Sequence, residues 1–362
     1  MPESATASAP AKTQPKAKKN RLSSGFFRFV LTRFLLIIPT VFILVTIVFF
    51  VMRATGDPIS AAMGGRLTPE ELQRRIHAAG YDRPLVVQYL DYLGGLLRGD
   101  LGTTLTDNQP VTTILTRYGA ATFELAFLSL IVALIVGIGL GRLAARRRDH
   151  AADAGIRVFA ILCYATPVFF LGLMLKLVFA VWLNVLPPSG RSSFASDMQF
   201  QRLVSPTGFY IIDAFQLGDM SVLVDVLRHA VLPALALGLL TAGVFIRLVR
   251  TNVISTYTSG YVEAARSRGV SEGRLLSKHA WRPAMIPIIT VMGMQIALML
   301  AGAVLTETTF EWKGLGFMLS QYLKQRDFVA VQGIVILIAI IVAVVNFIVD
   351  VISALIDPRV RY

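Results

Sequence analysis

Six long stretches without charged residues constrain the fold of this chain more than any other feature of its sequence. A bilayer core about 30 Å thick is crossed by roughly 20 apolar helical residues, each rising about 1.5 Å. The stretches lie at approximately 30–52, 121–142, 157–184, 229–249, 284–306 and 330–353. In hydrocarbon, only helices and closed barrels satisfy their own backbone hydrogen bonds. The sequence therefore predicts an all-α membrane protein with six transmembrane helices.

The composition agrees with a membrane protein and leaves little room for metal chemistry. Hydrophobic residues make up 55% of the chain and charged residues 16%, whereas soluble domains have about 25% charged residues. The single cysteine, Cys163, excludes an internal disulfide framework. The four histidines are scattered, which argues against a local histidine-based metal site. We expect neither a metal nor a cofactor.

The net charge of +13 raises nucleic-acid binding as an alternative, so the placement of the charges has to decide. Segments on the N-terminal side of the predicted spans hold 21 Lys and Arg residues against seven acids. Segments on the other side hold 13 against 14 acids. Lys and Arg accumulate in cytoplasmic loops, so both termini are predicted to be cytoplasmic. The charge is then explained by membrane topology, and we expect no nucleic-acid partner.

These patterns divide the chain into a membrane core and flanking segments. The first uncharged stretch has 19 residues, longer than the apolar region of about 7–15 residues in a signal peptide, and so favours an uncleaved span. The polar N-terminus lacks the apolar residues needed for folding. The expected divisions are a disordered cytoplasmic tail (1–28), transmembrane helix 1 (29–53), an extracytoplasmic helical region (54–117), a transmembrane core (118–356) with an inner loop (255–283), and a cytoplasmic C-terminal tail (357–362).

The outer segment 54–117 carries signals for two short helices. Thr68 and the proline after it predict a helix start, and this helix should run to Ala79 and stop at Gly80. A second helix should follow Pro84, with apolar residues at helical spacing on one face. The segment is interpreted either as a helical cap on the bundle, which periodicity alone favours, or as a docking surface for an extracytoplasmic partner.

The inner loop between the fourth and fifth stretches predicts two short helices joined at a glycine. Residues 261–268 contain good helix formers, and Gly269 follows where a left-handed stop is cheap. A second short helix should lie within 270–283. Such an elbow is suited to a groove in a soluble partner, because helix-in-groove contacts are a general recognition mode. By the residues alone, a basic loop that only folds locally is the favoured alternative.

A resemblance to a known family changes that balance. Glu263-Ala264-Ala265-x3-Gly269 is similar to the E-A-A-x3-G signature of the permease subunits of bacterial ABC importers, and it stands before the penultimate span as in that family. The general pattern ends I-x-L-P, which this chain lacks. His279, Arg282, Ala284 and Pro287 instead fit the H-x-x-R-x-A-x-x-P version of the dipeptide/oligopeptide (and nickel) permease branch.

Further motifs extend the resemblance from about Phe29 to Tyr362. They are Gly56-Asp57-Pro58, Gly99-Asp100-Leu101-Gly102, Ser189-Gly190-Arg191, His229-x3-Pro233, Gly302-Ala303-x-Leu305-Thr306-Glu307-Thr308, Gly314-Leu315-Gly316, Arg326-Asp327-Phe328, Val331-Gln332-Gly333 and Asp357-Pro358-Arg359. The resemblance implies a type I ABC importer permease bundle with a helical extracytoplasmic insertion between its first two helices. Such a bundle lies in the bacterial inner membrane, in contact with membrane lipid.

The resemblance also implies partners and a mechanism. The chain has no G-x4-G-K-[ST] phosphate loop, so it is expected to be non-catalytic, with ATP hydrolysed by other subunits. The family pairs such a permease with a paralogous second permease, two ABC ATPase subunits and an extracytoplasmic solute-binding protein, and imports di- or oligopeptides by alternating access. The residues that the resemblance assigns to ATPase coupling are Glu263, Ala264, Ala265, Gly269, His279 and Arg282.

Four residues in or near the spans are candidates for the substrate pathway: Lys176, Gln295, Met299 and Glu307. Each has a plainer interpretation. A charge within a span suggests function, but Lys176 near an outer end is expected to extend its amine toward the headgroups. Met299 is expected to pack, and Glu307 is equally an interfacial anchor. Glu124 is interpreted as a cap at the start of the second span.

Other functions remain as alternatives. In this family the binding protein largely sets selectivity, so nickel, an opine or another small solute stays open beside peptides. An intramembrane enzyme would need a nucleophile with its base, or paired carboxylates, at one depth, and no such pair stands out. A self-contained secondary transporter would be expected to show internal repeats and midplane charges, and the sequence has no convincing repeat.

Overall fold

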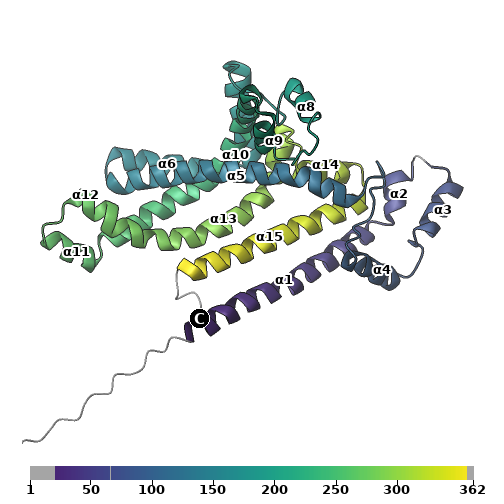
Figure 1. The fold of residues 1–362 in the computed structure, drawn as a ribbon, viewed down its shortest axis with the longest axis horizontal. Helices are drawn as coiled ribbons and strands as arrows, with labels where there is room; N and C mark the ends of the chain where they lie inside the picture. The colour runs from purple at the N-terminus through teal and green to yellow at the C-terminus, as the bar shows by residue number, and fades with distance from the viewer. Residues whose placement is uncertain (1–20, 66, 357–362) are drawn as a thin grey trace, which may run out of the picture.

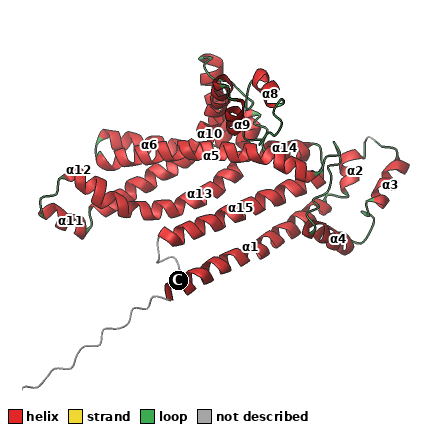
Figure 2. Ribbon diagram, in the orientation of Figure 1, coloured by secondary structure: helices red, strands yellow, loops and turns green. Residues whose placement is uncertain are grey.

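Helices form all of the regular secondary structure in the part of the chain that the computed structural model describes, residues 21–65 and 67–356. Within those residues an isolated bridge between Thr103 and Pro110 is the nearest approach to a strand (Figure 2). The expected C-terminal tail and most of the expected N-terminal tail lie outside the described residues, as does Asp357-Pro358-Arg359. The all-α fold class is confirmed.

Long helices make up the body of the molecule: α1 (Arg21–Ala54), α5 (Val111–Arg146), α10 (Met220–Tyr257), α13 (Trp281–Phe310) and α15 (Phe328–Ile356). Shorter elements complete it: α2 (Pro58–Met63), α3 (Pro69–Ala78), α4 (Leu85–Leu97), α6 (Ala151–Ala165), α7 (Val168–Leu175), α8 (Phe194–Phe200), α9 (Tyr210–Leu217), α11 (Gly260–Ser267), α12 (Glu272–Arg274), α14 (Leu315–Lys324) and the π-helical segments η1 (Lys176–Trp182) and η2 (Leu275–Ala280).

Among the described residues, four helices are long and apolar enough to cross a membrane, or up to six if each of two bent pairs forms one span. The unbroken candidates are Phe26–Ala54, Val111–Arg146, Met220–Tyr257 and Phe328–Leu355. They include four of the six predicted stretches. The multi-pass character is confirmed, whereas the count of six stays a prediction.

The predicted single span 157–184 is wrong as a straight helix. It is broken between α6 and α7–η1, whose axes differ by 108°. Pro167 stands at the break and the residue before it, Thr166, is extended at φ −79°, ψ 125°. A residue that precedes proline is pushed out of the helical region, because the proline ring clashes with its backbone. The proline therefore explains a bend that hydropathy did not reveal.

The second short helix expected within 270–283 does not form a separate element. Residues 272–310 run without interruption through α12, η2 and α13. They bend by 44° between the segments Glu272–Met285 and Pro287–Leu300. Proline removes one backbone donor and crowds the preceding turn, which accounts for a kink at Pro287. The inner loop is consequently continuous with the long helix α13.

The long helices lie side by side along the longest axis of the molecule (Figure 1). α11 and α12 lie at one end, α2 to α4 lie at the opposite end, and α8 and α9 project to one side. α10 is central, since it packs on α5, α13 and α6. A Cβ added at Gly137 would lie 2.5 Å from Phe245, and one at Gly238 would lie 2.7 Å from the Ser129 carbonyl oxygen. Such small residues allow membrane helices to approach closely.

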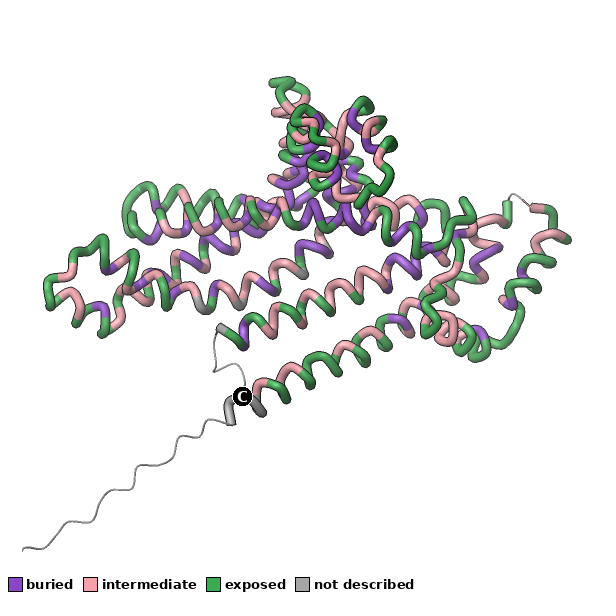
Figure 3. The backbone as a smooth tube through the Cα atoms, viewed as in Figure 1, coloured by how far each residue is buried: buried purple, intermediate pink, exposed green. Residues whose placement is uncertain are grey.

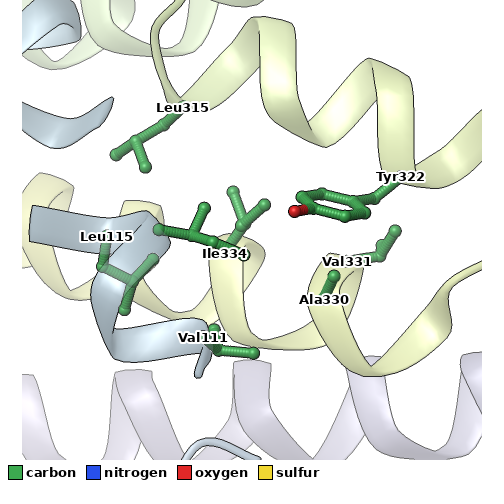
Figure 4. Packing of buried hydrophobic residues seen from close by; sticks show 8 residues of the cluster. Val111, Leu115, Leu315, Tyr322, Ala330, Val331 and Ile334 are labelled. Atoms are coloured by element: carbon green, nitrogen blue, oxygen red, sulfur yellow. The ribbon is translucent and has the colours of Figure 1, made fainter. Parts of the chain in front are cut away.

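Burial is concentrated where α5 and α10 meet, whereas α1 is largely exposed (Figure 3). Exposed apolar side chains on α1, such as Phe34, Phe42 and Phe50, suit contact with lipid. A second buried cluster ties α14 to the beginnings of α5 and α15 (Figure 4). Its members are Val111, Ile114, Leu115, Leu315, Tyr322, Ala330, Val331 and Ile334.

The two helices predicted in the outer segment are confirmed as α3 and α4. The Thr68 hydroxyl accepts a hydrogen bond from the Glu71 amide at 3.4 Å, as expected of a helix cap, and α3 ends at Ala78, one residue earlier than predicted. On α4, Tyr89 and Tyr92 pack against Phe49 of α1. Other apolar residues of α4 remain exposed, namely Leu85, Val86, Leu90 and Leu97.

Candidate functional site

The inner loop folds as a helix, a glycine turn and a second helix. α10 ends at Tyr257, α11 follows, and the chain turns at Gly269 with φ +81° before α12 begins. A Cβ at Gly269 would meet nothing within 4 Å, so the backbone angle and not lack of space requires a glycine here. The predicted helix and the left-handed turn are both confirmed. We call residues 260–283 the elbow.

An ion pair and a small buried core hold the elbow together. Val262 of α11 and Leu275 of η2 are fully buried. Arg266 Nε donates a 2.8 Å hydrogen bond to Glu272 Oε1, and the Tyr257 hydroxyl donates to the same carboxylate. The hydrogen bond to Glu272 raises the pKa of Arg266 above its ordinary value. The two arms of the elbow are thereby fixed to each other and to the end of α10.

The residues assigned to ATPase coupling lie mostly on the surface of the elbow. Glu263, Ala264 and Arg282 are exposed, and Ala265 and His279 are half-buried. In the described part of the chain, the Glu263 carboxylate has no hydrogen bond or ion pair. The acid that makes the internal ion pair is Glu272, which the sequence interpretation did not single out.

Away from the elbow, a buried ion pair joins the loop between η1 and α8 to α5. Arg191 Nη2 lies 2.5 Å from Glu124 Oε2, and the two side chains are 7% and 3% exposed. The other Glu124 oxygen accepts a hydrogen bond from the Ile211 amide at 2.8 Å, and the guanidinium lies 3.7 Å from the Tyr210 ring centroid. The interpretation of Glu124 as a helix cap is therefore wrong. α5 begins at Val111, more than three turns earlier.

Glu307 is fully buried beside this ion pair. Its carboxylate accepts hydrogen bonds from the Thr122 hydroxyl at 2.6 Å and the Phe317 amide at 2.9 Å. Thr122 in turn accepts from the Leu315 amide at 2.8 Å. Glu307 thus ties α13 to α5 and α14, and an interfacial anchor is excluded by its burial. Its assignment to the substrate pathway stays a prediction.

The other pathway candidates fall in different surroundings. Lys176 Nζ donates to the Thr309 carbonyl at 2.9 Å, so its amine stabilises the C-terminal end of α13. Met299 is 2% exposed within a core cluster that includes Leu125 and Trp312. Gln295 is half-buried on α13. The structure does not bring these residues and Glu307 into one site.

Three further buried carboxylates, those of Asp153, Asp213 and Asp327, were given no individual role by the sequence analysis. Asp327 is fully buried and accepts hydrogen bonds from the Leu105 and Thr106 amides at 2.6 and 2.9 Å. Asp153 is fully buried and forms a bidentate pair with Arg250 at 2.6 and 2.7 Å. A charged residue next to an apolar stretch is the sequence signal that could have identified them. That signal does not identify the partner, and Arg250 lies 97 residues from Asp153.

The described residues thus form an apolar helical bundle with a folded elbow at one end and buried ion pairs between its parts, an arrangement typical of a membrane-embedded subunit. Among the described residues, no group of three or more His, Cys, Asp and Glu side chains is placed to hold a metal ion. Residues 137–362 match the family described as binding-protein-dependent transport system inner membrane component, and residues 26–125 match its N-terminal counterpart. The chain belongs to this family.

Curated relatives agree along nearly the whole chain. The di/tripeptide transport system permease protein DppB of Pseudomonas aeruginosa (strain UCBPP-PA14) is 37% identical over 92% of this chain and 98% of the relative. The dipeptide transport system permease protein DppB of Escherichia coli (strain K12) is 37% identical over 92% and 99%. The probable D,D-dipeptide permease DdpB of the same strain is 36% identical over 84% and 88%.

A solved structure supports the fold. The inward-facing MetNI methionine ABC transporter superposes with a TM-score of 0.50 at 14% identity, covering 68% of this chain and 97% of that chain. The resemblance to ABC importer permeases is thus confirmed. The chain is a multi-pass inner-membrane permease subunit with no catalytic role of its own, and its family works with ATPase and solute-binding-protein partners.

Proposed function

We propose that the chain forms half of the pathway of an ATP-driven importer of di- or oligopeptides. The observation that carries this proposal is its similarity to peptide permeases over 92% of its length. The other half would come from a paralogous second permease, and two ATPase subunits would bind the inner face. Permeases for nickel, an opine or another small solute are the second candidate, because selectivity rests with the binding protein.

We propose an orientation with both termini and the elbow in the cytoplasm. The excess of Lys and Arg on that side supports it, since cytoplasmic loops accumulate these residues. The outer region 54–117, together with α8, α9 and α14, would then face the binding protein. The core 118–356 would carry the pathway, and the segment 255–283 would carry coupling.

The elbow would couple ATPase closure to movement of the bundle. Glu263, Ala264 and Ala265 would meet the ATPase, with the alanines permitting close approach and the acid supplying a charged hydrogen bond. His279 and Arg282 would contact the same surface. Because α12, η2 and α13 are continuous, a force on the elbow would reach the far end of α13. That end carries Glu307, whose bonds tie it to α5 and α14.

Movement of α13 would then change the outer end of the pathway. In the present arrangement, Glu307 and Lys176 hold α13 against its neighbours, and Met299 packs in the core. Rigid-body rocking that separates these contacts is one of the known routes to alternating access. Gln295, Met299, Glu307 and Lys176 would line or gate the pathway in the opened state.

Uptake by the reconstituted complex tests the proposal. Proteoliposomes that contain both permeases and the ATPases, supplied with the binding protein, should accumulate di- to pentapeptides only with ATP inside. Accumulation of Ni²⁺ and not peptides would favour the second candidate. Substrate flux through this chain alone, without ATPase subunits, would indicate a secondary transporter and contradict the proposal.

A further inference from the structure

A groove of about 190 Å³ lies between α6 and α10, on the half of the bundle that carries the elbow. Arg157, Ile161 and Tyr164 line it from α6, and Val244, Arg247 and Arg250 line it from α10. The groove takes no part in the contacts of the elbow or of the outer ion pair. Its walls are apolar at one end and cationic at the other.

The two helices that line the groove touch at two points. A Cβ at Gly243 would lie 2.6 Å from the Ala160 carbonyl oxygen, so the backbones are close there. Nearer the start of α6, Arg250 and Asp153 bridge the helices with a bidentate ion pair. Along the sequence, Arg157 and Arg247 lie between these two points, and Ile161 and Tyr164 line the groove beyond Ala160.

The cationic end has more positive charge than its carboxylate neutralises. Asp153 already forms its bidentate pair with Arg250, and Arg157 Nε lies 3.8 Å from the same carboxylate. Arg247 is exposed and has no hydrogen bond or ion pair within the described part of the chain. Two guanidinium groups, those of Arg157 and Arg247, therefore remain available to an anion at the mouth of the groove.

We propose that this groove binds an anionic phospholipid. Arg157 and Arg247 hold the headgroup phosphate, which guanidinium groups bind well through paired N–H donors. One acyl chain lies along Ile161, Tyr164 and Val244. Basic pockets between transmembrane helices are suited to such lipids, because the charge meets the headgroup while the apolar wall meets the chain.

The surroundings favour a lipid over a soluble anion or a second protein helix. On α6, the side chains of Val158, Ile161, Leu162 and Tyr164 are between 57% and 64% exposed, so the groove opens onto an apolar face. A soluble phosphate would leave that face uncovered. A helix of another subunit would need acidic groups opposite both arginines and an apolar stretch beside them, whereas one anionic phospholipid supplies both. The leaflet is the cytoplasmic one if the proposed orientation holds.

Photo-crosslinking of the complete transporter tests the site. The complex is placed in phosphatidylcholine nanodiscs with a photoreactive phosphatidylglycerol probe. Label is expected in peptides that contain residues 157–164 and 244–251, and unlabelled phosphatidylglycerol should compete whereas phosphatidylcholine should not. Each arginine contributes about 1 kcal/mol to the binding of an anionic lipid, so the double variant R157Q/R247Q should weaken labelling about thirtyfold.

Matched variants keep the result interpretable. R98Q/R202Q removes two exposed arginines elsewhere and should leave labelling unchanged, and R157K/R247K should keep much of it because the charge remains. Equal competition by phosphatidylcholine, unchanged labelling of R157Q/R247Q, displacement by inorganic phosphate as effective as by the lipid, or a second subunit cross-linked across the groove would each overturn the proposal. An elbow found outside the cell would overturn only the orientation.

Discussion

Arg191, in the loop between η1 and α8, pairs with Glu124 inside α5 at 2.5 Å across 67 residues of sequence. Neither residue is near a charge of opposite sign in the sequence, and each is buried in the fold. A buried ion pair gains stability only when its geometry and its remaining hydrogen bonds are good. Here the Gly208 carbonyl and the Ile211 amide supply two of those bonds, at 2.9 and 2.8 Å, whereas Arg191 Nε has no hydrogen-bond partner among the described residues.

Removing one member of this pair should destabilise the outer region strongly. In Arg191→Met the Glu124 charge is left buried without a partner, and such losses cost about 3–5 kcal/mol. The double variant R191M/E124M should recover much of the loss, since apolar replacement of both members is often neutral. Thermal unfolding of the detergent-solubilised complex measures the loss in the single variant and the recovery in the double variant.

Arg202→Met is the control for the loss of a cation from the same outer region, because Arg202 is exposed. It should leave unfolding unchanged. A single R191M variant as stable as R202M, or a double variant less stable than either single one, would show that the pair does not stabilise this region.

Gly269→Ala should impair coupling more than Gly273→Ala. Both positions have open space around a new Cβ, but only Gly269 has a left-handed backbone, at φ +81°. A side chain in that region costs about 1–2 kcal/mol. Peptide uptake per ATP hydrolysed should therefore fall in G269A and remain near wild type in G273A. Equal effects of the two substitutions would show that the left-handed turn at Gly269 is not needed for coupling.

Two acids in the elbow should respond differently to substitution. Glu263 is exposed and unpaired in the described residues, so Glu263→Ala should leave unfolding unchanged and weaken ATPase binding at least about fivefold, as for a contributing interface residue. Glu272→Gln should loosen the elbow itself, since Glu272 joins Arg266 and Tyr257. Hydrogen exchange of residues 260–283 separates the cases, and faster exchange in E263A would contradict this division.

Local features of the fold were predictable from sequence where one residue determines them. The Thr68 cap and the Gly269 turn depend on a few neighbouring residues, so spacing identified both. Pro167 is present in the sequence, but a hydropathy average over the whole apolar stretch does not register the break that this proline causes. The partners of Glu124 and Asp153 were not predictable, because tertiary packing brings together residues that are 67 and 97 positions apart. Burial of Glu307 depends likewise on α5 and α14.

Gly314→Ala should destabilise the junction of α13 and α14, and shortening a neighbouring side chain should relieve the effect. A Cβ at Gly314 would lie 2.4 Å from a Glu307 oxygen and 2.5 Å from its Cδ. That carboxylate cannot move freely, because Thr122 and Phe317 bond to it. Overpacking of this kind costs about 1–3 kcal/mol. Glu307→Asp withdraws the carboxylate by one methylene, so G314A/E307D should lose less stability than the sum of its single variants. Unfolding of all four proteins gives the coupling energy of the cycle, and strict additivity would mean that the two side chains do not share this space.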